Sequence, residues 1–162
     1  MAKEIERKFL VLNDDWRPLA TSSTPMRQAY IASMDDRSVR VRTRNGTSAM
    51  LTIKIGQSQL VRDEFEYPIP LTDAEELMTM AIGRVIEKTR HTVENGGFIW
   101  EVDVFEGAYQ GLVIAEVEMR SETDDPARPA WLGAEITGDR RYSNQSLAIE
   151  TSPTEFKNGL SH

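Results

Sequence analysis

A period-two alternation of charged and apolar side chains runs through most of this chain, and it limits the folds available to it. Because side chains of a β-strand point alternately to its two faces, such a stretch predicts a strand with one ionic and one apolar face. In the clearest case Arg40, Arg42 and Arg44 alternate with smaller residues. The predicted strands lie at about 3–12, 26–33, 38–45, 48–56, 60–69, 84–94, 98–106 and 112–121.

Short turn sequences join several of these stretches. Asn45-Gly46 and Asn95-Gly96-Gly97 are typical of tight hairpins between neighbouring strands. Eight strands with hairpin-like spacing predict a mainly β (α+β) fold, an eight-stranded antiparallel barrel flanked by a few helices.

Few segments have a helical pattern. The pair Thr72 and Glu75 has capping-box spacing and predicts a helix that runs to about residue 81. The Asp-Pro pair at 125–126 predicts a second helix ending near residue 133, and 143–149 predicts a third. Residues 20–25, rich in Ser, Thr and Pro, are predicted to form a loop.

Composition narrows the class of protein. The 162 residues fit one domain on a prior of roughly 150 residues per domain, so we expect a single domain at 1–150 and a C-terminal tail at 151–162. The absence of cysteine excludes disulfides, thiolate metal sites and a cysteine nucleophile. The net charge of -7 argues against nucleic acid or an anionic membrane as partner. Without a secretory signal or a long apolar run, the expected location is cytoplasmic.

The ionic faces need a physical explanation. A solvated face would account for any single strand, since antiparallel sheets often expose one face to water. Summed over the strands, however, this face is almost purely carboxylate, Arg and Lys, and carboxylates of like charge recur two residues apart, as at Glu4 and Glu6. Such pairs are costly unless cations lie between them. An inward-facing ionic surface in a barrel resolves this if its charges pair, stay hydrated or bind ions.

The donor types indicate what such a lumen would bind. Oxygen-only ligands, with no Cys and only 2 His, favour Mg²⁺ or Mn²⁺ over Zn²⁺ or Cu²⁺. Clustered Arg and Lys side chains favour a polyanion. A lumen carrying both kinds of charge suits a metal–polyphosphate complex.

The motif Glu4-Ile5-Glu6-Arg7-Lys8-Phe9 resembles the N-terminal Glu-x-Glu-x-Lys signature of the CYTH superfamily, the triphosphate tunnel metalloenzymes. The resemblance continues through Arg27-Gln28-Ala29-Tyr30, Val39-Arg40-Val41-Arg42, Leu51-Thr52-Ile53-Lys54, Glu64-Phe65-Glu66, Glu87-Lys88-Thr89-Arg90, Glu101-Val102-Asp103-Val104-Phe105-Glu106-Gly107, Ala115-Glu116-Val117-Glu118 and Tyr142-Ser143-Asn144-Gln145-Ser146-Leu147-Ala148. It implies an antiparallel tunnel with a charged lumen that hydrolyses or cyclises triphosphates with divalent metal. The compact chain is most similar to the small bacterial inorganic tripolyphosphatase branch.

The resemblance also suggests a role for each charged group. The expected triphosphate ligands are Lys8, Arg40, Arg42, Lys54, Lys88 and Arg90. The expected ligands of Mg²⁺ or Mn²⁺, with two ions, are Glu4, Glu6, Glu101, Asp103, Glu116 and Glu118. The expected catalytic residues are Lys88 beside the leaving phosphate, Glu64 or Glu66 as base for the attacking water, and Tyr30 near Lys88. For Arg44, Arg62 and Arg120, tunnel-mouth and surface positions both remain open.

The expected function is therefore metal-dependent hydrolysis of a linear triphosphate, first of all inorganic tripolyphosphate to pyrophosphate and phosphate. A class IV-type adenylyl cyclase and a nucleoside or thiamine triphosphatase are the alternative enzymes. A non-catalytic polyphosphate- or nucleotide-binding module is the alternative of another class, although a pure anion binder gains nothing from the carboxylate pairs. The expected partner is a small-molecule triphosphate, with no nucleic acid and no membrane, bound by a monomer or a homodimer.

Overall fold

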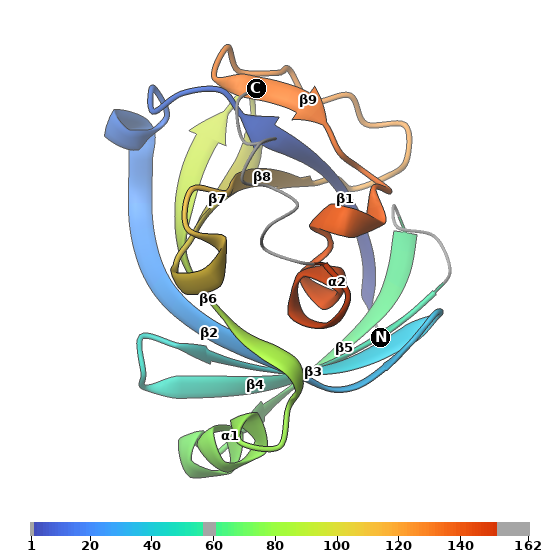
Figure 1. Cartoon of the computed structure of the whole chain (residues 1–162). Coiled ribbons are helices and arrows are strands. Elements are labelled where there is room, and N and C mark those ends of the chain that lie inside the picture. The colour runs from blue at the N-terminus through green and yellow to red at the C-terminus, as the bar shows by residue number, and fades with distance from the viewer. Residues whose placement is uncertain (1, 57–60, 152–162) are drawn as a thin grey trace.

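Eight antiparallel strands close into a barrel, and a ninth short strand is added outside it (Figure 1). The computed structural model describes residues 2–56 and 61–151. The strands are β1 (Ala2–Val11), β2 (Ala20–Met34), β3 (Arg37–Arg44), β4 (Ser48–Ile55), β5 (Val61–Ile69), β6 (Ile82–Asn95), β7 (Phe98–Phe105), β8 (Val113–Glu118) and β9 (Leu132–Glu135). Their order is β5-β4-β3-β2-β6-β7-β8-β1-β9, with an additional β5–β1 pairing that closes the barrel. The predicted barrel is confirmed.

Strand β1 closes the barrel because its two halves pair with different strands. Its first half pairs with β5, where Glu4 stands opposite Arg62. Its second half pairs with β8, where Glu6 stands opposite Glu118. Since directly opposed residues of an antiparallel pair share a face, this register gathers charges from both ends of the chain on one inner surface.

Among the residues that the structure describes, two α-helices accompany the barrel, α1 (Leu71–Met78) and α2 (Asn144–Ile149), with short 3₁₀ turns η1 (Arg17–Leu19), η2 (Gly107–Tyr109) and η3 (Arg140–Tyr142). Helix α1 follows Pro70 without a side-chain cap, so the predicted capping box does not form. Helix α2 confirms the helix predicted at 143–149, and the Ser146 amide donates to Ser143 Oγ at 3.0 Å as its N-terminal cap. In the described part of the chain, no helix has the length and apolarity to span a bilayer.

The structure contradicts two further sequence predictions, both of secondary structure. Residues 125–133 form no helix; they run in irregular conformation into β9, where Leu132 pairs with Val11 of β1. This segment buries Trp131 and Leu132 on the barrel wall, which an extended chain does as well as a helix. Residues 20–25 belong to β2, because pairing with β6 supplies hydrogen-bond partners that override their loop-like composition. Residue 60 of the predicted fifth strand and residues 152–162 of the predicted tail lie outside the described residues.

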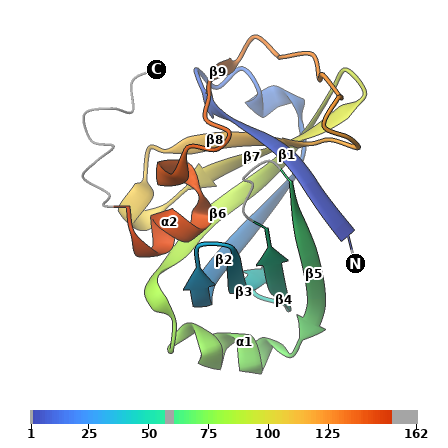
Figure 2. The same ribbon diagram turned by 90° about the vertical axis from the view of Figure 1, so that its right-hand side faces the viewer.

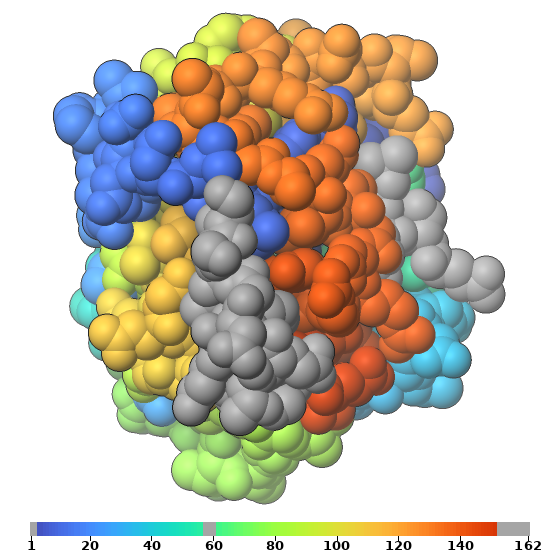
Figure 3. Space-filling view, turned by 45° about the horizontal axis from the view of Figure 1, so that its top comes forward, coloured from blue at the N-terminus to red at the C-terminus, as the bar shows by residue number. Residues whose placement is uncertain are grey.

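The apolar outer faces of the strands are covered by other parts of the same chain. Helix α1 lies against β2, β3 and β4 (Figure 2). Its Ala74 and Met78 pack in one cluster with Val41. On the opposite wall, Trp16 and Trp131 complete a cluster over β1, β6, β7 and β8. Figure 3 shows the β9 segment in orange beside the end of β1 in blue. Burial of these faces leaves the inner surface for the charges.

The inner surface itself has an apolar part and an ionic part. Helix α2 lies across one end of the barrel (Figure 1). Its Leu147 and Ala148 pack in one cluster with inward residues such as Tyr30, Ile86 and Phe105. The inserted helix therefore occupies an apolar part of the lumen, and the predicted charged side chains line the rest.

Candidate active site

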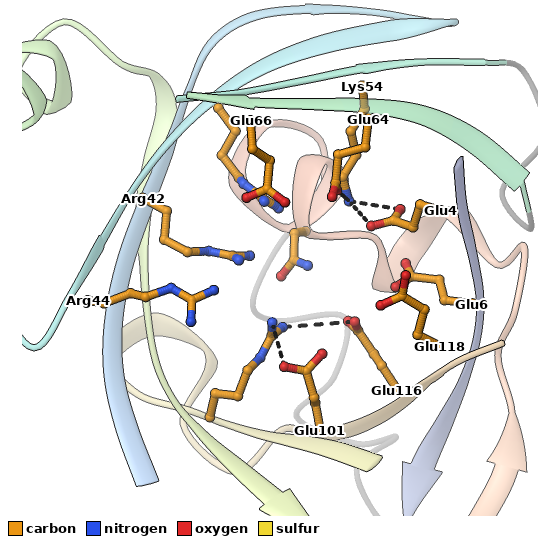
Figure 4. A pocket seen from close by; sticks show the side chains of 13 residues that line it. Glu4, Glu6, Arg42, Arg44, Lys54, Glu64, Glu66, Glu101, Glu116 and Glu118 are labelled. Carbon is orange, nitrogen blue, oxygen red and sulfur yellow. Dashed lines mark hydrogen bonds and ion pairs between the residues drawn. The ribbon is translucent and has the colours of Figure 1, made fainter. Parts of the chain in front are cut away.

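A cavity of about 230 Å³ occupies the ionic part of the lumen (Figure 4). It is lined by Glu4, Glu6, Arg40, Arg42, Arg44, Lys54, Glu64, Glu66, Arg90, Glu101, Glu116, Glu118 and Asn144. Among the described residues that line it, every one is charged except Asn144. These residues offer no apolar surface on which a ring could pack, and their chemistry suits a small, highly charged ligand.

Three arginines form the basic wall of this cavity. Arg40, Arg42 and Arg44 occupy successive inward positions of β3 and line the cavity. Arg42 and Arg44 approach it from the side opposite Glu6 and Glu118 (Figure 4). Within residues 2–56 and 61–151, none of the three forms an ion pair with a carboxylate. Burial, together with the charges of Arg40 and Arg90, lowers the pKa of Arg42 to about 9. This wall therefore carries uncompensated positive charge, which an anion would stabilise.

The facing wall is an arc of carboxylates. Glu6 and Glu118 are directly opposed in the β1–β8 ladder, and Glu116 lies next to them (Figure 4). Burial and the neighbouring Glu116 raise the pKa of Glu6 to about 7. Burial, followed by the charges of Glu4 and other carboxylates, also raises the pKa of Glu118. A cation between these groups would relieve the repulsion, as in the pairs discussed above.

These carboxylates fit Mg²⁺ or Mn²⁺ in their chemistry. They supply only oxygen donors, which these hard ions prefer. Among the described residues, no three acidic or histidine side chains are already grouped as ligands of one ion. Binding would therefore require glutamate side chains to rotate, which their length permits.

Two lysines form ion pairs with carboxylates of the lumen. Lys8 Nζ lies 3.7 Å from both Glu6 and Glu116, and it does not line the main cavity. Lys54 Nζ lies 3.0 Å from Glu4 and 3.6 Å from Glu64, and it does line the cavity. The predicted phosphate ligand Lys54 is thus in reach of a ligand. Lys8 lies behind the acids and acts here as their counterion.

A buried carboxylate joins Lys88 and Arg90 of β6. Asp103, only 1% exposed, accepts hydrogen bonds from Arg90 Nε and Nη2 at 2.7 and 2.8 Å, and Lys88 Nζ lies 2.6 Å from Oδ2. Both carboxylate oxygens are occupied and Asp103 does not line the cavity, so this geometry favours a positioning role over the metal-ligand role predicted for it. Burial lowers the pKa of Lys88 to about 7 despite this partner.

Of the other predicted catalytic residues, Glu64 and Glu66 line the main cavity and Tyr30 does not. Glu64 and Glu66 both line the cavity from β5 (Figure 4). Tyr30 is buried in the apolar cluster beneath α2, but it lines a small second cavity together with Lys8, Arg40, Lys54, Arg62 and Asn144. Its side chain therefore lies among inward basic residues of the tunnel, and its catalytic role stays a prediction.

Several polar residues of the site were not among the predicted ligands. Arg44 lines the cavity, and Arg62 lies 3.5 Å from Glu4; their shared parity with the other bases was the signal for both. Arg120 lies instead in a groove outside this cavity. Asn144 lines the cavity from α2 and accepts a hydrogen bond from Lys88 Nζ at 3.2 Å, a position that strand parity cannot reveal.

The lumen of this closed antiparallel barrel has a basic wall on one side and an arc of carboxylates on the other. This arrangement defines a class of site that suits a polyanion together with divalent cations. The chain matches the CYTH domain over residues 2–151 and belongs to this family. It is 44% identical over 148 residues to an inorganic triphosphatase of Acetivibrio thermocellus, covering 91% of this chain and 94% of the relative. It is 39% identical over 150 residues to an inorganic triphosphatase of Nitrosomonas europaea, covering 90% and 97%.

Solved structures share the fold. A crystal structure of an inorganic triphosphatase has a TM-score of 0.65 at 35% identity and covers 94% of this chain and 98% of its own. A conserved hypothetical protein of Pyrococcus furiosus has a TM-score of 0.60 at 20% identity, covering 74% and 80%. The second likeness supports the barrel alone.

Proposed function

We propose that this protein is a divalent-metal-dependent hydrolase of linear triphosphates whose principal substrate is inorganic tripolyphosphate, cleaved to pyrophosphate and phosphate. The observation that carries the proposal is the cavity in which Arg42 and Arg44 of β3, which form no ion pair with a carboxylate of the described residues, face the crowded carboxylates of β1 and β8. Its relatives named inorganic triphosphatase, at 39% and 44% identity over most of both chains, support the same activity.

The lining of the cavity favours an inorganic over an organic triphosphate. A nucleoside or thiamine triphosphate carries a ring that proteins commonly hold on apolar or aromatic surfaces. The main cavity offers charged side chains and one amide, and its volume is about 230 Å³. Tripolyphosphate presents only phosphate oxygens, which these side chains can bind throughout.

The proposed substrate ligands are the basic residues that line the cavity, namely Arg40, Arg42, Arg44, Lys54 and Arg90. The guanidinium forks suit bidentate contacts to phosphate oxygens. Lys8 and Lys88 support this set from behind, since neither lines the main cavity.

The proposed metal ligands are the cavity carboxylates Glu4, Glu6, Glu101, Glu116 and Glu118. Two bound Mg²⁺ or Mn²⁺ ions would neutralise phosphate charge and lower the pKa of a water. Either Glu64 or Glu66, which line the same cavity, accepts a proton as the water oxygen attacks the terminal phosphorus. The bond between that phosphorus and the bridging oxygen breaks, and pyrophosphate leaves.

Lys88 is proposed to stabilise the leaving pyrophosphate through its positive charge, since its Nζ is buried against Asp103 and Asn144 and does not line the main cavity. Burial lowers the pKa of this ammonium to about 7, so its charge falls as pH rises through neutrality. Asp103 and Asn144 hold Nζ in place from two sides. Asp103 is thus proposed to position Lys88 and Arg90 and not to bind metal.

A substrate panel tests the proposal. Purified protein is incubated with tripolyphosphate, ATP or thiamine triphosphate, each with Mg²⁺ or Mn²⁺, while release of phosphate and cyclic nucleotide is measured. We expect the highest kcat/KM for tripolyphosphate and no cyclic AMP from ATP. Faster turnover of ATP or thiamine triphosphate would reassign the substrate, and cyclic AMP would indicate a cyclase. Tight binding of tripolyphosphate without any turnover would make the protein a binding module.

A further inference from the structure

Gln28 is a fully buried polar residue beside the basic wall of the cavity, and it has no role in the proposed reaction. It lies on β2 directly opposite Arg42 of β3, so the two side chains share the inner face of the barrel. Arg42 Nε donates a hydrogen bond to Gln28 Oε1 at 3.0 Å. Because a guanidinium can only donate, this contact fixes the orientation of the amide.

The second half of the amide is not satisfied. Gln28 is 0% exposed, and its Nε2 has no hydrogen-bond partner among residues 2–56 and 61–151. An unpaired buried donor lowers the stability of the fold, and an apolar side chain of similar length would avoid this cost. The hydrogen bond with Arg42 is therefore the interaction that favours a glutamine at this position.

The contact differs from the one that holds the nearby Arg90. Asp103 engages Arg90 through both Nε and Nη2 and carries a charge that compensates the guanidinium. Gln28 engages Arg42 through Nε alone and is neutral. Arg42 thereby keeps its two terminal nitrogens and its full charge, and it projects into the cavity (Figure 4).

We infer that Gln28 is a positioning residue for triphosphate binding, which orients the fork of Arg42 toward a phosphate group without neutralising it. The inference rests on the proposed function. The neutral amide at position 28 matters for this role. An acidic residue there would hold Arg42 equally well, but it would neutralise the charge that the substrate needs.

Two substitutions separate these contributions. Gln28→Met keeps the length of the side chain and loses the hydrogen bond, while Gln28→Glu keeps an acceptor and adds a charge. With tripolyphosphate and Mg²⁺, we expect Gln28→Met to raise KM about tenfold with a smaller change in kcat, as for loss of one charge-assisted contact. We expect Gln28→Glu to raise KM at least as much. The melting temperature of Gln28→Met should stay close to that of the wild type, because removal of the unpaired Nε2 offsets the loss of the acceptor for Arg42 Nε.

A double-mutant comparison tests whether Gln28 acts through Arg42. In an Arg42→Ala background, Gln28→Met should raise KM no further. The buried neighbour Met26, changed to Leu, is the matched control for repacking of β2 and should leave KM unchanged. An unchanged KM in both Gln28 variants, or an equal effect of Gln28→Met with and without Arg42, would overturn the inference. A wild-type protein that does not cleave tripolyphosphate would instead overturn the proposed function.

Discussion

At the scale of single residues, the partner of each charged side chain decides what it can do. The inward arginines of β3, Arg40, Arg42 and Arg44, have no carboxylate partner among the described residues, whereas Arg90 and Lys88 share Asp103. The charged form of Glu6, in contrast, is disfavoured by burial and by the neighbouring carboxylate of Glu116. The site therefore holds unsatisfied charge of both signs before any ligand enters.

The first prediction concerns the basic wall. Arg42→Ala removes a guanidinium from the cavity and should lower kcat/KM for tripolyphosphate by roughly 10²–10³, in the range found when one preorganised charged contact is removed. Arg37 is the matched control, because it lies on the same strand but is exposed and paired with Asp36 at 3.0 Å. Steady-state kinetics of Arg42→Ala and Arg37→Ala check this. Equal losses in both variants would refute a specific role for Arg42.

The second prediction concerns the pH dependence of stability. The pKa of Glu6 in the fold, about 7, lies above its ordinary 4.5, so its contribution to unfolding free energy falls as pH rises between these values. Glu6→Gln removes that cost. In metal-free buffer it should raise the melting temperature at pH 8 and change it little at pH 4.

Thermal unfolding at both pH values measures this difference, with the exposed Glu122→Gln as control. A gain of equal size at pH 4 and pH 8 would show that the charge of Glu6 is not the cause. Added Mg²⁺ should stabilise the wild type more than Glu6→Gln, because only a charged ligand gains from the ion.

At the scale of elements, the close packing of α2 against β6 keeps Asn144 beside Lys88. Gly83 of β6 has φ +72, and a Cβ at this position would lie 2.1 Å from the carbonyl oxygen of Ala148. Only glycine allows the strand and the helix to approach this closely. The position of the helix, and hence of Asn144, depends on this contact.

The third prediction follows from that contact. Gly83→Ala should destabilise the protein by more than Gly46→Ala, which is expected to cost about 1 kcal/mol for its positive φ alone. Gly46 has φ +64 with no atom within 4 Å of the added Cβ, so the pair separates backbone strain from collision. Chemical denaturation of both variants gives the two values. A Gly46→Ala variant as unstable as Gly83→Ala would argue against the collision.

The barrel could be predicted from the sequence, and its irregular parts could not. Strand parity placed Arg40, Arg42 and Glu6 on the inner face because a two-residue period is a local property of the backbone. Whether Asp103 meets an ion or a neighbouring base depends on cross-strand register, which parity does not contain. The failed helix at 125–133 and the insertion of α2 both depend on tertiary burial of a short segment. Asn144 could not be found for the same reason.

At the scale of the whole molecule, closure of the barrel allows an acidic protein to hold a polyanion. The net charge of -7 describes the chain as a whole. Inside, the first strand meets both β5 and β8, and the β3 arginines face the resulting carboxylates across the lumen. Because fields in such a cavity are set by nearby groups, net charge does not forbid an anionic ligand there.

The most direct test of this account is the metal dependence of tripolyphosphate cleavage, followed by ³¹P NMR in the wild type and in Glu118→Gln. With Mg²⁺ or Mn²⁺ we expect the wild type to convert tripolyphosphate to equal amounts of pyrophosphate and phosphate. Chelation of the metal should stop this reaction, and Glu118→Gln should slow it strongly while the fold is kept. Cleavage that continues at full rate without divalent metal, or that is unaffected by Glu118→Gln, would contradict the proposed division of the lumen into a phosphate-binding wall and a metal-binding wall.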